Sequence, residues 1–533
     1  PYTVIISPFG AAMLSISELS PKKRAFLTGT ILLTGTGFAC RVLGFFYRIF
    51  LSRTIGAEGL GIYNMIHPIF GICFALCAGS VQTALSQHIA SHTARGRSIF
   101  RTGTVISMTM SFVLAFLICR HAEFLANVIL MEPRCTPYMP IMGISVPFAA
   151  FHACINGYYY GMQKSHVPAF SQIVEQILRM TLVFFIADSW IKSGHTITVM
   201  LAAYGHLIGE IASSLFTLFC LLFFPPQRKD IAAGFLAPGT AGPLMALALP
   251  LMGNRLVLNL LSSAEAIWIP SRLQMSGLNN DQAFAVYGVL TGMALPFILF
   301  PSAITNSLAV LLLPSVAKDQ AEGRKGSIAA SMSLSLRYSL YMGILCIGIF
   351  TLFGEELGVS VFHDPDAGRF IRILAWLCPF LYLATTMGSI LNGLGKTRTT
   401  FLQNTAALLL RIGFVLFGIP WFGILAYLWG MLISEILLAL LHLWSLKRMV
   451  SFTWDAWDMI VKPALLLMIS IGVFYFTNGL YPFSSSLPMF FVTAIQILFL
   501  CFCYGGLLLV FHFARKGKDQ LVRCWNHSID RES

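Results

Sequence analysis

Charged residues are scarce in this sequence. Only 11% of its 533 residues are charged, whereas 57% are hydrophobic, and a soluble domain carries roughly 25% charged residues. Apolar runs of about 20 residues, the length that crosses a bilayer, recur from one end of the chain to the other. The loops between them are short, which excludes a separate soluble domain. The composition therefore predicts a polytopic membrane protein.

Signatures of catalysis and of metal binding are also missing. Most of the 12 cysteines lie inside apolar runs without zinc-site spacing, so we expect packing residues and no disulfide framework. His88 and His92 have the i,i+4 spacing that could hold a metal, but a pair of histidines at a helix end is the simpler interpretation. No P-loop, Ser-His-Asp elbow or dinucleotide fingerprint occurs in a strand–turn–helix context. We expect no enzyme, no cofactor and no metal.

The excess of positive charge, +13 in total, is spread over short loops and does not form one patch, so we expect no nucleic-acid partner. Alternate loops, starting with the N-terminus, hold 22 Lys and Arg residues, whereas the intervening loops hold six. This asymmetry follows the positive-inside rule. It predicts an even number of helices, with both termini in the cytoplasm.

We expect an all-α fold of about fourteen transmembrane helices. The apolar runs place them near 25–51, 61–85, 102–119, 139–160, 167–187, 197–224, 243–268, 284–314, 328–352, 370–391, 399–418, 422–445, 459–479 and 488–513. The eighth contains Pro296 and Pro301 and is expected to be kinked.

An internal repeat relates residues 155–179 to residues 391–411. Both copies contain an Asn-Gly pair, a Phe-x-Gln triplet and a lysine followed 15 residues later by an arginine, Lys164 and Arg179 in the first copy and Lys396 and Arg411 in the second. A period of six helices implies two halves with the same orientation, which is typical of transporters. Glu210 and Glu435 lie at matching depths of the sixth and twelfth helices.

The repeat predicts the organisation of the chain. The stretch 4–16 is weakly apolar and precedes three basic residues, the reverse of the order in a cleaved signal, so 1–24 is expected to be a cytoplasmic leader. The remaining parts are an N-lobe at 25–224, a C-lobe at 243–445, a helix pair at 459–513 and a cytoplasmic tail at 514–533.

Seven arginines and four glutamates fall inside the predicted spans. A charge at the centre of a membrane helix costs roughly 3 kcal/mol, so such residues are expected to face a partner or a cavity. The set has a net charge of +3, which favours a phosphate or pyrophosphate ligand. The residues are Arg41, Arg48, Arg179, Arg255, Arg337, Arg372, Arg411, Glu175, Glu210, Glu265 and Glu435.

Several of these charges have alternative interpretations. Glu175 and Arg179 are four residues apart and could neutralise one another. His206 lies one turn before Glu210, which is compatible with a proton relay, but the match of Glu210 with Glu435 in the repeat favours a shared structural role. We assign Glu175, Arg179, His206, Glu210, Glu265, Arg411 and Glu435 to a coupling or structural charge network.

Five segments resemble the polysaccharide-exporter branch of the MOP flippase superfamily. The resemblance implies a MATE-like fold with two six-helix lobes and a central cavity, in the bacterial cytoplasmic membrane. The sequence gives no reason to assign an oligomer, and we expect a monomer. The resemblance also implies an undecaprenyl-pyrophosphate-linked sugar as cargo, with a peptidoglycan precursor as the leading candidate, and a groove for the lipid tail on helices 13 and 14. The segments are 41–45, 53–63, 171–179, 254–265 and 287–301.

In the related lipid II flippases, an arginine in the Arg-Val-Leu-Gly-Phe segment of helix 1 contributes to a cationic cavity, and here that residue is Arg41. Helices 2 and 8 of this sequence lack the cavity arginines of those relatives, and Arg255 on helix 7 could replace them. We expect Arg41, Arg255 and Arg48 to bind the pyrophosphate and Asn259 to meet the sugar. Coupling to protons, sodium or the membrane potential stays open.

Two other functions compete with this one. A cation-coupled multidrug antiporter of the same fold would need a key acid in the cavity of the N-lobe and a net negative cavity. A membrane-embedded glycosyltransferase or polymerase would need catalytic acids on large outer loops. The acids at 355–366 lie on one short loop, which favours solvated loop charges.

Overall fold

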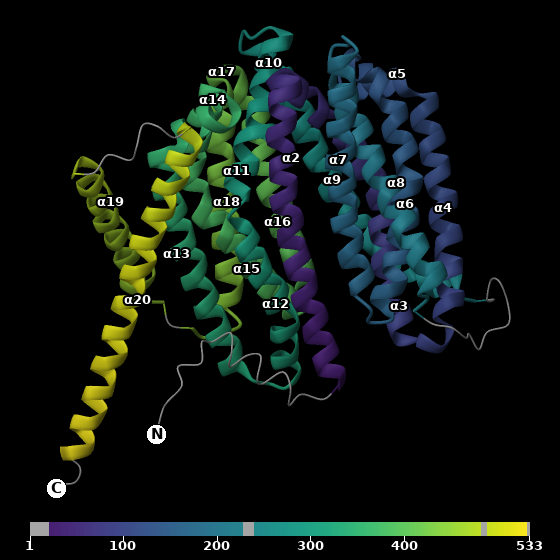
Figure 1. Cartoon of the computed structure of the whole chain (residues 1–533). Coiled ribbons are helices and arrows are strands. Elements are labelled where there is room, and N and C mark those ends of the chain that lie inside the picture. The colour runs from purple at the N-terminus through teal and green to yellow at the C-terminus, as the bar shows by residue number, and fades with distance from the viewer. Residues whose placement is uncertain (1–20, 227–238, 453, 481–487, 530–533) are drawn as a thin grey trace. The chain divides into compact units, whose positions relative to one another are not determined.

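A computed structural model describes residues 21–226, 239–452, 454–480 and 488–529, and these residues form helices and connecting turns without a β-strand (Figure 1). The described parts form two compact units. Unit 1 comprises Pro1–Gly288 with Val415–Gly423, and unit 2 comprises Val289–Phe414 with Ile424–Ser533. The all-helical fold predicted from the apolar runs is confirmed.

Unit 1 contains the helices from α2 to α10 and the short helix α17. Their bounds are α2 Pro21–Phe74, η1 Ala75–Gly79, α3 Ser80–Ser91, α4 Gly96–Arg120, α5 Ala122–Phe124, α6 Met139–Gly161, α7 His166–Lys192, α8 Val199–Phe223, α9 Ala241–Met275, α10 Asn280–Gly288 and α17 Ile419–Phe422.

Unit 2 contains the remaining helices. Their bounds are η5 Val289–Ala294, α11 Leu295–Leu299, α12 Ser302–Ala321, α13 Lys325–Leu357, η6 Gly358–Phe362, α14 Pro365–Leu374, η7 Ala375–Leu377, α15 Cys378–Gly393, α16 Thr397–Gly413, α18 Ile424–Lys447, η9 Trp457–Val461, α19 Lys462–Leu480 and α20 Met489–Ile529. The π-helix η8 Phe414–Gly418 belongs to unit 1 from Val415 onward.

Thirteen helices of the described chain are long and apolar enough to cross a membrane. The first, Leu32–Ser91, has 60 residues, which is about 90 Å of helix against a hydrocarbon core of about 30 Å. Gly56 breaks the helical conformation inside α2 with φ 71° and ψ −178°, a conformation that glycine adopts readily. The stretch therefore supplies two crossings, and the predicted number of about fourteen is confirmed.

The order of helix packing repeats between the units. In unit 1, α6 packs against α3, α4 and α8, and α7 packs against α8. In unit 2, α15 packs against α12, α13 and α18, and α16 packs against α18. The glycine of each Asn-Gly pair lies at a close approach: a Cβ on Gly157 would lie 2.8 Å from the carbonyl oxygen of Gln82, and one on Gly393 would lie 2.9 Å from that of Leu313. Close helix packing explains why both copies of the repeat contain this glycine.

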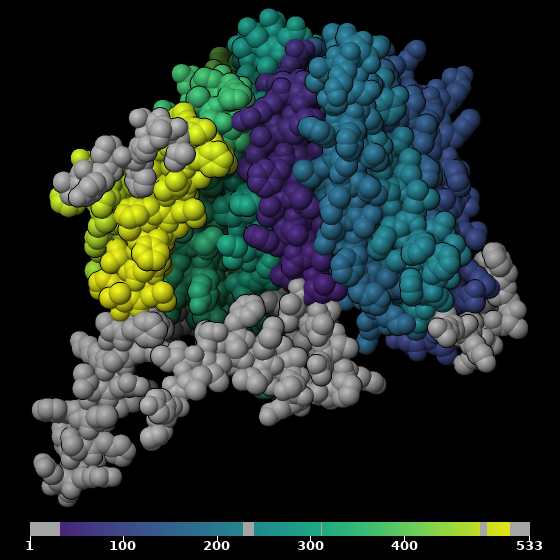
Figure 2. Space-filling view, in the orientation of Figure 1, coloured from purple at the N-terminus to yellow at the C-terminus, as the bar shows by residue number. Residues whose placement is uncertain are grey.

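Each unit has an apolar core and an apolar exterior. Leu85 and Ile89 of α3 pack with Tyr158 and Tyr159 of α6 in unit 1. Large apolar side chains also face outward on the membrane helices, for example Phe116, which is 68% exposed. On one face of unit 1, α2 and α7 lie side by side (Figure 2). An exterior of this kind suits a lipid environment.

Some predicted segments lie outside the described residues: residues 1–20 of the leader, the basic residues Arg228 and Lys229, and residues 530–533 of the tail. Within the predicted tail, α20 continues as a helix to Ile529. The two six-helix lobes stay a prediction, and unit 1 as packed here also includes α9 and α10.

Candidate functional site

The residues predicted to bind the pyrophosphate lie in unit 1, on α2 and α9. Arg41 and Arg48 are two turns apart on α2 and both are exposed, which places them on one face of the helix. Arg255 and Asn259 are one turn apart on α9 and are half-buried. α2 packs against α9, and both helices belong to unit 1. Arg41 and Arg48 lie before the break of α2 at Gly56, in its first crossing.

Arg255 lies against a π-helical widening of the second crossing. The segment η1 ends at Gly79, and a Cβ there would occupy the position of Arg255 Nη1. The Nη2 of Arg255 donates a hydrogen bond to Thr83 Oγ1 at 3.1 Å. π-bulges are frequent at functional sites. Because the threonine hydroxyl is neutral, this bond positions the guanidinium without cancelling its charge.

Asn259 supports the same arrangement. Its Nδ2 donates a hydrogen bond to the backbone oxygen of Gly71 at 3.3 Å. This bond joins α9 to α2 one turn away from Arg255. The amide group also has a second N–H and an oxygen, so it can both hold the helices and meet a sugar hydroxyl.

A cluster of charged and titratable side chains lies where α7 packs against α8. Arg179 forms an ion pair with Glu175, and their side chains are only 14% and 19% exposed. The guanidinium of Arg179 also fills the space that a Cβ on Gly209 would need, beside Glu210. The ion pair that the i,i+4 spacing of Glu175 and Arg179 allows is present in the structure.

Glu210 has a different partner from the one that its spacing suggests. His152 of α6 places its Nε2 2.9 Å from Glu210 Oε2, whereas the Nε2 of His206 is 4.0 Å from Oε1. The His206 ring instead packs edge-on against the rings of Phe70 and His67 of α2, with centroids 4.5 Å and 5.7 Å away. Glu210 therefore has two histidine neighbours, and His152 is the nearer because α6 packs against α8. A proton relay through His206 stays a prediction.

Sequence reasoning missed His152, which lies inside an apolar run and has no acid at helical spacing. Its position four residues before Asn156 of the repeat is the signal that could have identified it, since Asn156 Nδ2 lies 3.5 Å from His152 Nδ1. Glu265, on α9, is buried at 4% exposure and lies within electrostatic reach of Tyr287 of α10.

Unit 2 carries the second copy of the charge network. Arg411 of α16 lies 4.0 Å from Glu435 of α18, measured between Nη1 and Oε1, and the two side chains are 19% and 14% exposed. The same two helices are also joined by a polar contact, in which His442 Nδ1 of α18 lies 2.7 Å from Gln403 Oε1 of α16. Gln403 belongs to the Phe-x-Gln triplet of the repeat, so the triplet joins α16 to α18.

An ion network ties three loops of unit 1 on the side that the sequence predicts to be external. Arg134 contacts Glu58, lies 2.7 Å from Glu132 and lies 2.9 Å from Asp281. Burial raises the pKa of the Glu132 carboxyl, but hydrogen bonds from Arg134 and Asn280 lower the pKa by more than burial raises it. The net pKa of Glu132 is therefore below the ordinary value. The network joins the segment after Gly56, the segment before α6 and the start of α10.

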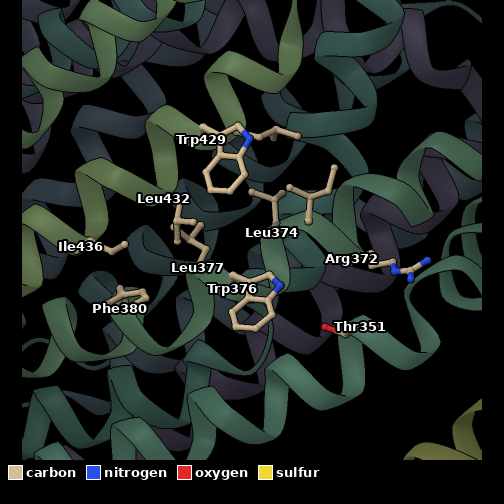
Figure 3. A pocket seen from close by; sticks show the side chains of 11 residues that line it. Thr351, Arg372, Leu374, Trp376, Leu377, Phe380, Trp429, Leu432 and Ile436 are labelled. Carbon is tan, nitrogen blue, oxygen red and sulfur yellow. The ribbon is translucent and has the colours of Figure 1, made fainter. Parts of the chain in front are cut away.

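Unit 2 contains an apolar pocket of about 650 Å³ among α13, α14, α15 and α18 (Figure 3). Trp376 and Trp429 line it and are 56% and 58% exposed. The guanidinium of Arg372 points away from the apolar centre (Figure 3) and pairs with Glu355 Oε1 at 2.7 Å. The pocket thus presents hydrocarbon and suits a lipid chain, whereas the predicted pyrophosphate arginines lie in unit 1.

The chain matches a known protein family and a known relative over most of its length. A family described as "Polysaccharide biosynthesis protein" matches residues 26–318, more than half of the chain. Stage V sporulation protein B of Bacillus subtilis (strain 168) is 27% identical over 442 residues, which cover 80% of this chain and 85% of that protein.

Two solved structures share the fold. The lipid II flippase MurJ in an inward closed conformation matches with a TM-score of 0.70 and 16% identity, covering 91% of this chain and 99% of that one. An inward-facing multidrug resistance MATE family transporter of the MOP superfamily matches with a TM-score of 0.63 and 15% identity, covering 79% of this chain and 98% of that one. The predicted MATE-like fold is confirmed.

Proposed function

Because the chain belongs to the polysaccharide biosynthesis protein family, we propose that this multi-pass membrane protein is a flippase for an undecaprenyl-pyrophosphate-linked oligosaccharide in the bacterial cytoplasmic membrane. The leading cargo is a peptidoglycan precursor or a related polysaccharide unit, by analogy with the lipid II flippase of the same fold. The observation that carries the proposal is the guanidinium of Arg255, held against Gly79 by the neutral hydroxyl of Thr83.

Arginine suits this ligand for a geometric reason. Its planar guanidinium donates two parallel hydrogen bonds to phosphate oxygens. Arg41 and Arg48 offer two guanidinium groups on one face of α2, and Arg255 offers a third on α9. Asn259, one turn from Arg255, supplies amide groups for the sugar.

Translocation in this proposal follows alternating access. The pyrophosphate and sugar bind at the arginines from the cytoplasmic side, on which the basic loops place both termini. Movement of the two lobes then exposes the headgroup to the other leaflet while the lipid tail stays in the bilayer, along the groove that the resemblance assigns to α19 and α20. In this proposal the protein acts as a monomer and moves its substrate without chemical change.

Coupling is assigned to the buried network of unit 1. Histidine is the side chain that exchanges a proton near neutral pH, and His152 Nε2 lies 2.9 Å from Glu210 Oε2. Protonation of this pair would change the charge between α6 and α8. Sodium or the membrane potential are the other sources of energy that the same charges could use.

The test is headgroup translocation in proteoliposomes that contain a fluorescent undecaprenyl-pyrophosphate-linked sugar. We expect the wild type to move the headgroup and the Arg41→Ala/Arg255→Ala variant to lose about 100-fold in rate, because each charge-assisted bond contributes about 1.5–3 kcal/mol. Arg372→Ala is the matched control, since this arginine also lies in a predicted span and pairs with Glu355.

The opposite result is equally specific. A wild type that moves no lipid-linked sugar, but expels organic cations when a proton or sodium gradient is applied, would identify a cation-coupled multidrug antiporter. Equal loss of rate in the control variant would remove the assignment of the pyrophosphate to Arg41 and Arg255.

A further inference from the structure

A second pocket lies in unit 1, away from the arginines of α2 and α9. It has a volume of about 570 Å³ and is formed by the start of α4, the end of α6 and the end of α8. These three helices pack against one another in pairs, α4 with α6 and α6 with α8 (Figure 1). The pocket is lined by Arg97, Phe100, Arg101, Tyr158, Leu221, Leu222, Phe223 and Pro225.

The walls of this pocket are fixed by long-range contacts. The rings of Phe100 and Tyr158 stack with centroids 4.9 Å apart and form a rigid floor. Two hydrogen bonds hold the chain that follows α8: Tyr159 donates to the backbone oxygen of Phe224 at 2.9 Å, and Lys164 donates to that of Pro226 at 3.0 Å. The pocket is therefore a preformed part of the fold.

The lining has two chemically different ends. Arg97 and Arg101 are one turn apart on α4 and form the basic end of the pocket. The opposite wall is apolar and open to the surroundings, since Leu222 and Phe223 are 67% and 66% exposed. A ligand that fits both ends carries a negative headgroup and a hydrocarbon chain.

The side of the membrane on which the pocket is expected to lie indicates whether this ligand is a lipid or a soluble phosphate compound. The two arginines belong to one of the basic loops that the positive-inside rule places in the cytoplasm. The cytoplasmic leaflet contains anionic lipids, and basic pockets between transmembrane helices on this side bind phospholipid headgroups. A soluble phosphate would match the arginines but not the exposed apolar wall.

We propose that the pocket formed by Arg97, Arg101 and the end of α8 binds an anionic phospholipid of the cytoplasmic leaflet. The two guanidinium groups bind the lipid phosphate, and an acyl chain lies along Leu222 and Phe223. The site is separate from the flippase site and does not depend on the identity of the transported sugar.

The experiment compares phosphatidylglycerol with phosphatidylcholine of the same acyl chains, added to the purified full-length protein and counted by native mass spectrometry. We expect the wild type to retain phosphatidylglycerol preferentially. The Arg97→Gln/Arg101→Gln variant should bind it about 30-fold more weakly, at about 1 kcal/mol for each basic residue near the surface. Lys447→Gln/Arg448→Gln removes the same charge from an exposed site of unit 2 and should change the affinity less than twofold.

A second pair of variants leaves both arginines in place. Leu222→Glu adds a negative charge to the apolar wall at a position that is 67% exposed, so we expect the protein to fold and phosphatidylglycerol binding to weaken several-fold. Leu222→Gln has the same shape without the charge and should bind within twofold of the wild type. Phosphatidylglycerol should raise the thermal unfolding midpoint of the wild type and of the two controls, Leu222→Gln and Lys447→Gln/Arg448→Gln. It should not raise the midpoint of the two pocket variants.

The outcomes separate cleanly. Equal retention of phosphatidylglycerol by the wild type and the double arginine variant would overturn the proposal, as would an equal loss in the Lys447→Gln/Arg448→Gln control. Displacement of the lipid by millimolar inorganic phosphate would assign the pocket to a soluble phosphate compound and also overturn it. Preferential retention that only the pocket variants lose supports it.

Discussion

Arg179 and Glu210 in unit 1 match Arg411 and Glu435 in unit 2 in the internal repeat, yet their partners differ. In unit 1 the arginine pairs with Glu175 on its own helix, and Glu210 lies 2.9 Å from His152. In unit 2 the arginine and the glutamate lie 4.0 Å from each other. The matched arginine and glutamate therefore lie close to each other in unit 2, whereas in unit 1 each has a partner outside the matched pair.

The difference arises at two positions of the sequence. Aligned through the arginines of the repeat, Glu175 corresponds to Ala407, and aligned through the Asn-Gly pairs, His152 corresponds to Gly388. Gly388 admits the ring of His442, whose Nε2 would lie 3.1 Å from a Cβ at that position. Unit 1 thus combines a carboxylate with a histidine, whereas the carboxylate of unit 2 faces an arginine that stays charged at any physiological pH.

The comparison predicts unequal losses when the two arginines are removed. Arg179→Ala should lower the free energy of unfolding by about 3 kcal/mol, because it leaves Glu175 buried without its partner. Arg411→Ala should cost about 1 kcal/mol, since its ion pair is longer, at 4.0 Å, and weaker. Unfolding in detergent, followed by circular dichroism, measures both, and equal losses would contradict the distinction between the units.

The outer network of unit 1 offers the next largest effect. Arg134→Ala should lower the free energy of unfolding by about 2 kcal/mol, less than for a fully buried pair because Arg134 is 32% exposed while Glu132 is 1% exposed. The pKa of Glu132 is lowered from 4.5, so its contribution is present above about pH 4.5 and is lost as the pH falls through the lower pKa of the folded state.

Unfolding at several pH values checks this sign. The wild type should lose stability below about pH 4.5 more steeply than Glu132→Gln, which has no carboxyl to protonate. Parallel curves for the two proteins would show that the network contributes nothing to the acid response.

A third prediction concerns the pH profile of translocation. His152→Gln should lower the rate about tenfold and flatten its dependence between about pH 5 and pH 8, because the variant cannot exchange a proton with Glu210. The groups facing this pair are His206 on α8, Glu175 and Arg179 on α7, and Asn156 on α6. The proteoliposome assay at a series of pH values measures the profile.

The control for this prediction comes from the other copy of the repeat. His442→Gln removes a buried histidine of unit 2 that contacts Gln403, and the pH profile should keep its shape. If His442→Gln flattened the profile and His152→Gln did not, the assignment of the titratable pair to unit 1 would be wrong.

The smallest effect is expected at an exposed pair of unit 2. Arg369 lies 3.2 Å from Asp366, and the two side chains are 72% and 62% exposed. Arg369→Ala should change the free energy of unfolding by less than about 0.5 kcal/mol, because exposed ion pairs contribute little. A loss as large as that of Arg134→Ala would show that exposure does not distinguish the outer loops of the two units.

The sequence by itself determined the features that depend on order along the chain. Hydropathy placed the spans because a bilayer accepts only long apolar helices, and the cost of a charge inside a span singled out Arg41 and Arg255 as candidates. The spacing of Glu175 and Arg179 predicted their ion pair, since residues four apart share one helix face. The repeat also predicted that Arg411 and Glu435 belong to one network.

Only the tertiary structure decided which helices meet and which faces they turn to each other. His152 is 58 residues from Glu210, Arg255 is 172 residues from Thr83, and Arg134 is 147 residues from Asp281. Hydropathy reports that a helix lies in the membrane but does not fix its rotation or its neighbours. These contacts depend on close packing at glycines such as Gly79 and Gly157, where the absence of a side chain lets one helix approach another.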